Sequence, residues 1–192
     1  MIRALAIAVL TLGSTCLPVL AADVGKPSPE FAIRYNDGTQ KLLSSFRGKV
    51  VCLEFLHTTC PHCQQTSSEM SQLYTEFGSK GFQPLGVAWN DMANLLVPDF
   101  IKDFHINYPI GFAPREEVMA YLGFTAERSV VPQIVWIDRK GIVRSQTEAM
   151  GQTDLKLRGV PYWREMIETL TKEPGPAASR RPAPHRTVAK KS

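Results

Sequence analysis

An apolar, β-forming run that ends just before a pair of cysteines places the strongest constraint on how this chain folds. Residues 50–56 have the sequence VVCLEFL, so Glu54 alone interrupts an otherwise apolar segment. Runs of this kind are typical of strands that helices cover on both faces. Cys60 and Cys63 follow at once, and apolar residues then recur at helical spacing as far as Gly78. The sequence therefore predicts a buried strand that delivers two cysteines to the start of a helix.

The remaining segments complete an α/β pattern. Asn36-Asp37-Gly38 is a strong hairpin turn, and Arg139-Lys140-Gly141 joins two further strands that must run antiparallel. Pro161 predicts a kink in the last helix or a later start for it. We expect a mixed central sheet flanked by helices, with an N-terminal β-hairpin and a helical insert. Strands are expected at residues 31–35, 40–42, 50–56, 82–89, 108–110, 133–138 and 142–146, and helices at residues 61–78, 95–104, 116–122 and 154–171.

Three segments of different composition divide the chain. Residues 1–22 resemble an export signal, because Arg3 is followed by an apolar run and then by small residues up to Ala22. We expect cleavage after Ala21 or Ala22 and an extracytoplasmic, periplasmic location; anchoring by an uncleaved N-terminus is the alternative. Residues 23–172 form one domain. Residues 173–192, rich in Pro, Ala, Arg and Lys, are expected to form a disordered basic tail.

The positive charge of the chain is concentrated in that tail. The whole chain carries a formal charge of +4, but residues 172–192 alone carry +5. Between Arg3 and this segment the charge is −2. A nucleic-acid-binding domain needs a basic face on its folded part, so the composition argues against a nucleic-acid partner.

The Cys60-Pro61-His62-Cys63 tetrad predicts redox chemistry. A C-x-x-C motif beside a βαβ pattern is the known mark of thioredoxin-like exchange enzymes. Unpaired amides and the helix dipole favour a thiolate on Cys60, and Pro61 suits the first helical position. His62 adds stabilisation if it is protonated or donates a hydrogen bond. Cys63, one turn along, is placed to attack a mixed disulfide on Cys60. This chemistry needs no cofactor.

Two structural roles compete with the redox prediction. A zinc site needs two further ligands, and the four histidines of the chain complete no familiar spacing with the cysteines. A static disulfide between Cys60 and Cys63 would close a very small loop and stabilise little. A copper site that includes His57 ranks low for the same lack of ligands. We therefore assign no metal.

Glu54 supports the redox prediction. A carboxylate on a central strand is costly to bury and usually has a shifted pKa. Beneath the dithiol it is expected to accept the proton of Cys63 when that thiol attacks. The alternative is a carboxylate at the strand end that reaches water. Cys52 shares the strand face of Glu54 and is expected to be a buried, inert thiol.

At this point the sequence resembles known families. The tetrad, with Glu54 six residues before Cys60, is similar to the active site of the DsbA disulfide oxidants. The frame differs: the first hairpin, the approach at residues 46–51 and the segment 137–141 resemble the TlpA/ResA/redoxin branch of the thioredoxin fold. This likeness covers residues 24–171. It implies an α/β thioredoxin fold and an exchange enzyme.

The resemblance also implies a role for Val131 and Pro132. Family members carry a cis-proline that faces the dithiol at the start of a strand, and Pro132 occupies that position. Its expected role is to present the backbone of Val131 to the substrate chain. Gln133 departs from the threonine that is common after this proline.

The sequence thus predicts an exported enzyme that exchanges disulfides with protein cysteines, with a membrane redox partner that recycles the dithiol. The tetrad favours an oxidant, whereas the frame favours a TlpA/ResA-like reductant, for example in cytochrome c maturation. A thiol peroxidase ranks lower, because Leu53 and His57 occupy the places where peroxiredoxins carry Pro and Thr or Ser. A metal carrier or a redox-inert domain is the non-enzymatic alternative.

Overall fold

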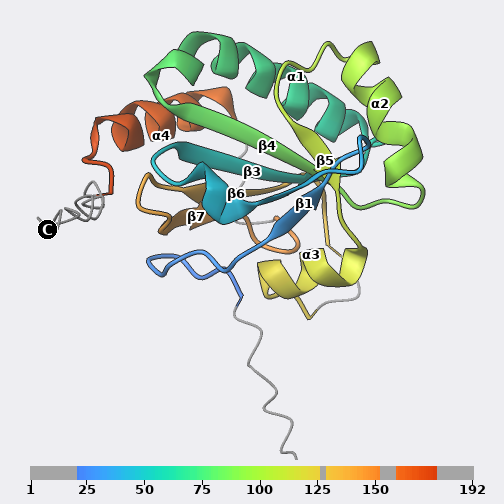
Figure 1. Ribbon diagram of the computed structural model, residues 1–192, viewed down its shortest axis with the longest axis horizontal. Helices are drawn as coiled ribbons and strands as arrows, with labels where there is room; N and C mark the ends of the chain where they lie inside the picture. Colours follow the sequence, from blue (N-terminus) through green and yellow to red (C-terminus); the bar gives the residue numbers. More distant parts are fainter. Residues whose placement is uncertain (1–20, 126–128, 152–158, 177–192) are drawn as a thin grey trace, which may run out of the picture.

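The computed structural model describes residues 21–125, 129–151 and 159–176. In this part of the chain a single sheet has the strand order β2-β1-β5-β4-β3-β6-β7 (Figure 1). Its strands are β1 (Ala32–Arg34), β2 (Gln40–Leu42), β3 (Val50–Leu56), β4 (Phe82–Ala88), β5 (Ile110–Phe112), β6 (Gln133–Ile137) and β7 (Val143–Gln146). The helices are α1 (Pro61–Phe77), α2 (Ala93–Asp103), α3 (Arg115–Leu122) and α4 (Val160–Lys172), with short 3-10 turns η1 (Leu43–Phe46) and η2 (Gly78–Lys80).

The sheet is mixed, as the sequence predicts. The central strands β3, β4 and β5 run parallel, and β6 lies antiparallel to β3. The hairpins β1–β2 and β6–β7 form the two edges. Helices α1 and α2 connect the parallel pairs and lie on one face of the sheet, whereas α3 lies on the other face. Strand β3 is therefore covered on both faces, which explains its nearly continuous apolar sequence.

Two cores lie on opposite faces of the sheet. Helices α1, α2 and α4 cover one face, and α3 with the N-terminal segment covers the other (Figure 1). Alternation along β3 sends Cys52 and Leu56 to the first core, and Leu53 and Phe55 to the second. Every residue of β3 is buried, and each large apolar side chain buried in this way contributes about 1.5–3 kcal/mol. This double burial fixes the position of the loop that follows β3.

Some element boundaries differ from the prediction. Helix α4 starts at Val160, which is the later start that Pro161 predicted as the alternative to a kink. Pro161 therefore lies in the first turn, where no amide donor is needed. The short strand β5 begins at Ile110 and not at residue 108, because Tyr108 turns its ring into the first core. The expected start of the last helix near residue 154 lies outside the described residues.

The expected domain boundaries are only partly visible. The carboxylate of Glu173, the residue after α4, accepts a hydrogen bond from Arg144 Nη1 at 2.6 Å. An ion pair with a neighbouring strand therefore holds this residue in place. The export signal, apart from residues 21–22, and the tail from residue 177 onward lie outside the described residues. Within the described part, no helix has the length and apolar character needed to cross a membrane.

Candidate active site at the end of β3

The two cysteines lie at the start of α1, just after the loop that follows β3. Cys60 is the N-cap residue of α1, with extended backbone and Pro61 in the first turn. Cys60 is partly exposed, whereas Cys63 is fully buried, and both are free thiols. The backbone N–H of His57 donates to Cys63 Sγ at 3.5 Å. The sulfur that a substrate can reach is therefore that of Cys60, and Cys63 lies behind it.

A side chain from the end of β4 fixes the loop that presents Cys60. Asn90 Oδ1 accepts from the backbone N–H of Thr58 at 3.0 Å, and Asn90 Nδ2 donates to Thr58 Oγ1 at 3.2 Å. Gln64 Nε2, on the first turn of α1, donates to the Thr58 carbonyl at 3.1 Å. The sequence indicates no such role for Asn90, which acts here across 32 residues of chain.

Glu54 lies beneath the dithiol and not in solvent. Its side chain is 1% exposed, so the expectation of a carboxylate that reaches water is wrong. Its carboxylate oxygens accept from Ser67 Oγ at 3.0 and 3.1 Å and from the Tyr108 hydroxyl at 3.0 Å. Burial raises the pKa of Glu54 to about 7, although both hydrogen bonds act to lower it. A carboxyl group with this pKa gains and loses a proton near neutral pH.

The environment of Cys63 keeps its proton in place. Burial raises the pKa of the Cys63 thiol, and the nearby charge of Glu54 raises it further. The amide of His57 acts in the opposite direction, because it donates a hydrogen bond to the sulfur. Cys63 thus needs a proton acceptor before it can attack, and Glu54 is close enough to influence its titration. Burial also raises the pKa of Cys52, which accords with an inert thiol on this face.

His57 packs against an aromatic ring. Its ring centroid lies 4.3 Å from that of Trp89, in an edge arrangement. Burial lowers the pKa of His57, so its imidazole is neutral at pH 7. In the part of the chain that the structure describes, no three His, Cys, Asp or Glu side chains converge as metal ligands would.

A hollow of about 430 Å³ adjoins the first turns of α1. The Val131–Pro132 peptide bond beside it is cis, as the resemblance implied. His62 is exposed and lies on the α1 side of the hollow, opposite Val131 and Pro132. The structure thus brings together three of the predicted site residues. The hollow is lined by His62, Gln65, Thr66, Glu69, Val130, Val131, Pro132, Met150 and Gly151.

Gln133 holds the loop that contains the cis-proline. It is fully buried, and its Nε2 donates to the carbonyl of Val130 at 2.7 Å and to that of Glu148 at 3.1 Å. Its Oε1 accepts from Thr147 Oγ1. The side chain that departs from the usual threonine therefore joins the two segments that form one wall of the hollow. The sequence marks Gln133 as a departure from the usual threonine but does not indicate this anchoring role.

Comparison with known proteins shows the family of the chain. The model of the AhpC/TSA family matches residues 24–146. The chain belongs to the AhpC/TSA family. The thiol-disulfide oxidoreductase ResA of Geobacillus kaustophilus is 30% identical over 125 residues, which cover 65% of this chain and 68% of that protein. The ResA of Bacillus thuringiensis subsp. konkukian is 26% identical over 121 residues, 63% of this chain and 67% of that protein.

Solved structures support the fold. A putative thiol:disulfide interchange protein DsbE from Chlorobium tepidum has a TM-score of 0.63 at 24% identity and covers 79% of this chain and 99% of its own. A putative protein disulfide isomerase from Bacteroides thetaiotaomicron has a TM-score of 0.63 at 25% identity, with 79% and 92% covered. These comparisons confirm the thioredoxin fold, the resemblance to the ResA branch and the predicted enzyme class, a thiol–disulfide oxidoreductase. The likeness of the tetrad to DsbA stays a prediction.

Proposed function

We propose that this protein is an exported reductant of protein disulfides, which draws electrons from a membrane redox partner. The observation with the most weight is the match to ResA proteins, which extends over about two thirds of the chain. The sequence favoured an oxidant on the strength of the tetrad. The relatives support the alternative instead, because they belong to the branch that the frame resembles.

The proposed reaction uses two sulfurs and one carboxylate. The Cys60 thiolate attacks a substrate disulfide, which breaks the S–S bond, forms a mixed disulfide and releases one substrate thiol. Cys63 then gives its proton to Glu54 and attacks Cys60 Sγ. The second substrate thiol leaves. The substrate disulfide has then been reduced by two electrons, and the Cys60–Cys63 dithiol has been oxidised to a disulfide. The membrane partner reduces this disulfide and completes the cycle, so no cofactor is required.

The electrostatics of the site support a reductant. A strongly stabilised Cys60 thiolate would favour the dithiol and make the disulfide an oxidant. His57 adds no positive charge beside it, because burial lowers its pKa and keeps the ring neutral at pH 7. The buried Glu54 carboxylate raises the pKa of Cys63 and so opposes a second thiolate. Because of both effects, the Cys60–Cys63 dithiol has a higher free energy than it would have if cationic side chains lay beside it.

The hollow beside the dithiol supports a polypeptide substrate. Its walls include the exposed apolar side chains Val130 and Met150, and His62 borders it on the α1 side. We assign to Val131 the backbone contact with the substrate chain, with Pro132 fixing its orientation. An extended segment with a disulfide at its centre would place one sulfur at Cys60.

The reduction potential of the Cys60–Cys63 couple tests this proposal. The purified protein is equilibrated in glutathione buffers, and the oxidised fraction is measured at pH 7. We expect a value near that of thioredoxin, about −270 mV, or lower. A value near about −120 mV, as in DsbA, would refute the reductant and restore the oxidant. A control with Cys52→Ala should leave the value unchanged, since that thiol takes no part in the couple.

A further inference from the structure

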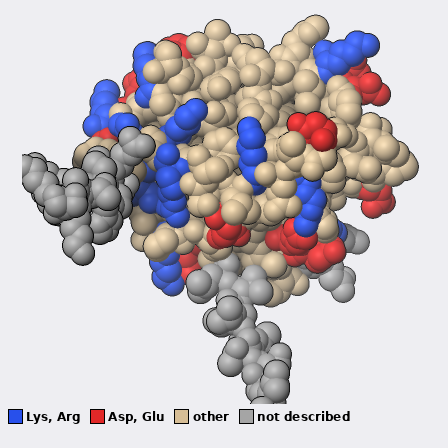
Figure 2. Space-filling model, viewed as in Figure 1, with Lys and Arg blue, Asp and Glu red and all other residues tan. Residues whose placement is uncertain are grey.

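Basic side chains gather at the end of the sheet opposite the dithiol. This basic end lies where β3 and β4 begin and β6 ends. Figure 2 shows Lys and Arg gathered toward the left, beside the end of α4, and most Asp and Glu toward the right. All but one of its residues, Arg139, are exposed. The basic end consists of Arg47, Lys49, Lys80, Arg139, Lys140, Arg144 and Lys172.

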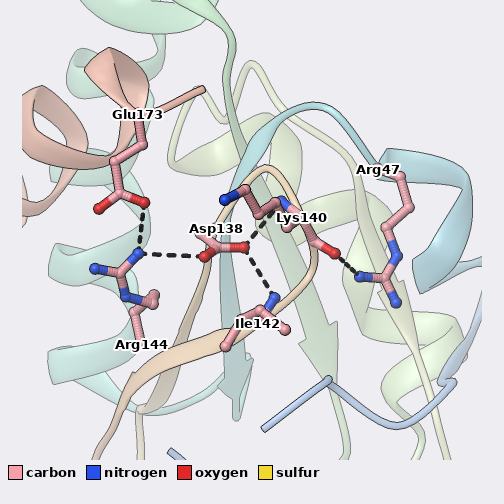
Figure 3. A network of polar contacts seen from close by, with 6 residues as sticks. All are labelled: Arg47, Asp138, Lys140, Ile142, Arg144 and Glu173. Carbon is pink, nitrogen blue, oxygen red and sulfur yellow. Dashed lines mark hydrogen bonds and ion pairs between the residues drawn. The ribbon is translucent and has the colours of Figure 1, made fainter. Parts of the chain in front are cut away.

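Backbone hydrogen bonds hold this surface together. Arg139 Nε donates to the carbonyl of Gly48 at 3.0 Å, and the Gly48 N–H donates back to the Arg139 carbonyl at 2.9 Å. Arg47 donates to the carbonyl of Lys140 across 93 residues of chain (Figure 3). Asp138 accepts from the backbone N–H of Lys140 at 2.9 Å and so fixes the turn. The charges are therefore displayed from rigid turns.

Among the residues that the structure describes, most of these cations form no ion pair, although Lys80 lies over the ring of Phe77 at 4.5 Å. Arg144 pairs with Asp138 at 3.2 Å and with Glu173 at 2.6 Å. Among the described residues, no carboxylate lies within the 4.0 Å limit of an ion pair from the other six cations. Arg47, Lys49 and Arg139 instead donate to neutral oxygens. Their charge is available to an external anion.

We propose that the basic end docks the protein on an anionic lipid surface, with the dithiol directed away from it. The charges spread over a broad end and do not converge on one pocket. The hollow found there, of about 200 Å³, is lined by Glu30 and Asp138 as well as by Arg47 and Lys49, which makes it a poor site for a small anion. A membrane rich in anionic headgroups matches an extended set of cations. Strand β3 separates this end from the loop of the dithiol by about 20 Å.

The sequence after α4 adds further positive charge to the chain. Helix α4 ends at Lys172 in the basic end, and residues 174–192 add five Lys and Arg without an acid. Each Lys or Arg held near an anionic bilayer strengthens binding by about fivefold. The span between Arg3 and residue 172 has a net negative charge even though it contains six of the seven cations of the basic end. Outside the basic end this span is therefore acidic, which would orient the molecule with the basic end toward the lipid.

Vesicle partitioning tests the proposal. The protein is purified after export and mixed, in low salt, with one of two kinds of vesicle. One kind contains phosphatidylcholine alone, and the other contains phosphatidylcholine with about 30% phosphatidylglycerol. The measured quantity is the ratio of the two partition coefficients, which cancels any apolar contribution from the N-terminal segment. The test variant is Lys49→Gln/Lys140→Gln. The matched control, Lys41→Gln/Lys102→Gln, removes the same charge from β2 and α2.

We expect the unaltered protein to prefer anionic vesicles and to lose that preference in high salt. The basic-end variant should show a ratio about 25-fold lower, because two contributions are lost. The control should change it less than about twofold. An unaltered protein without preference for anionic vesicles overturns the proposal, as does a basic-end variant that binds like the control. Disulfide exchange in solution should be equal in all three proteins, so this test is independent of the direction of electron flow.

Discussion

The two ends of β3 differ in how they use charge. At the dithiol end Glu54 and Cys63 are buried, and burial together with the nearby charge of Glu54 raises the pKa of Cys63. At the other end most charged side chains are exposed, and of the seven cations of the basic end only Arg144 pairs with carboxylates of the described residues. Because the first end is buried, the gain or loss of one proton changes its electrostatic energy strongly. Because the second end is exposed and screened by salt, its interactions depend on the sum of its charges.

This difference predicts that the two ends can be altered separately. Substitutions near Cys60 should change exchange chemistry and leave lipid binding intact. Substitutions near Asp138 should change stability or lipid binding and leave the chemistry intact. A variant at either end that alters both properties would break the separation.

The largest effect is expected from the cysteines. Cys60→Ser should reduce disulfide exchange to the rate of buffer alone, because the accessible nucleophile is lost. Cys63→Ser should keep the first attack but not the release, so that mixed disulfides with substrate accumulate. Mass spectrometry after mixing with a model disulfide protein distinguishes the two variants. If Cys63→Ser loses the first attack and Cys60→Ser forms the adduct, the assignment of roles is reversed.

Glu54→Gln is expected to have the next largest effect. A positioned proton acceptor contributes about 10²–10⁴ in rate, so release of the mixed disulfide should slow by at least about 10² at pH 8. In the unaltered protein, burial raises the pKa of Glu54 to about 7, so this step should be fast above that pH and slow below it. In the variant the same transition should vanish. Stopped-flow measurement of single turnover between pH 5 and pH 9 tests this; a retained transition would exclude Glu54 as the acceptor.

Glu54→Gln should also change how the free energy of unfolding depends on pH. The pKa of Glu54 in the folded protein lies above its ordinary value of 4.5. The native state therefore holds a proton that the unfolded state releases between about pH 4.5 and pH 7. Stability should therefore fall as the pH rises through this window, by about 3 kcal/mol, and remain lower above it. Glu54→Gln should lack this fall, as urea unfolding at pH 5 and pH 8 would show. An equal fall in both proteins would contradict the assigned pKa.

Asp138→Ala probes the other end. The carboxylate accepts from two backbone amides and from Arg144, so its loss should cost about 2 kcal/mol of unfolding free energy. Asp37→Ala is a matched control, because Asp37 also accepts from a turn but is fully exposed, and its loss should cost less. The exchange rate per folded molecule should be unchanged in both. A slower rate in Asp138→Ala would mean that the two ends are coupled.

Local patterns and long-range contacts were not equally accessible from the sequence. The buried strand, the cap position of Cys60 and the mixed sheet follow from periodicity, from Pro61 and from the tight turns, all of which act over a few residues. Ser67 and Tyr108 bond Glu54 from positions 13 and 54 residues away, and no local pattern marks a residue for such a contact. The cis-proline role came from resemblance, and the ion pair of Glu173 needed the packing of α4 beside β7.

Tyr108→Phe tests the smallest of these effects. The substitution removes one hydroxyl that donates to the Glu54 carboxylate at 3.0 Å and keeps the ring in the core. A hydrogen bond to a charged group contributes about 1.5 kcal/mol, so its loss should raise the pKa of Glu54 by about one unit. The transition in the rate of release should then move from about pH 7 to about pH 8. Tyr121→Phe is the matched control, because its hydroxyl bonds Ser28 at 2.8 Å on the opposite face of the sheet. If the midpoint moves equally in both variants, the shift comes from loosened packing and not from the hydrogen bond. If it moves only in Tyr108→Phe, a residue remote in sequence sets the pKa of the carboxyl group that accepts the proton of the dithiol.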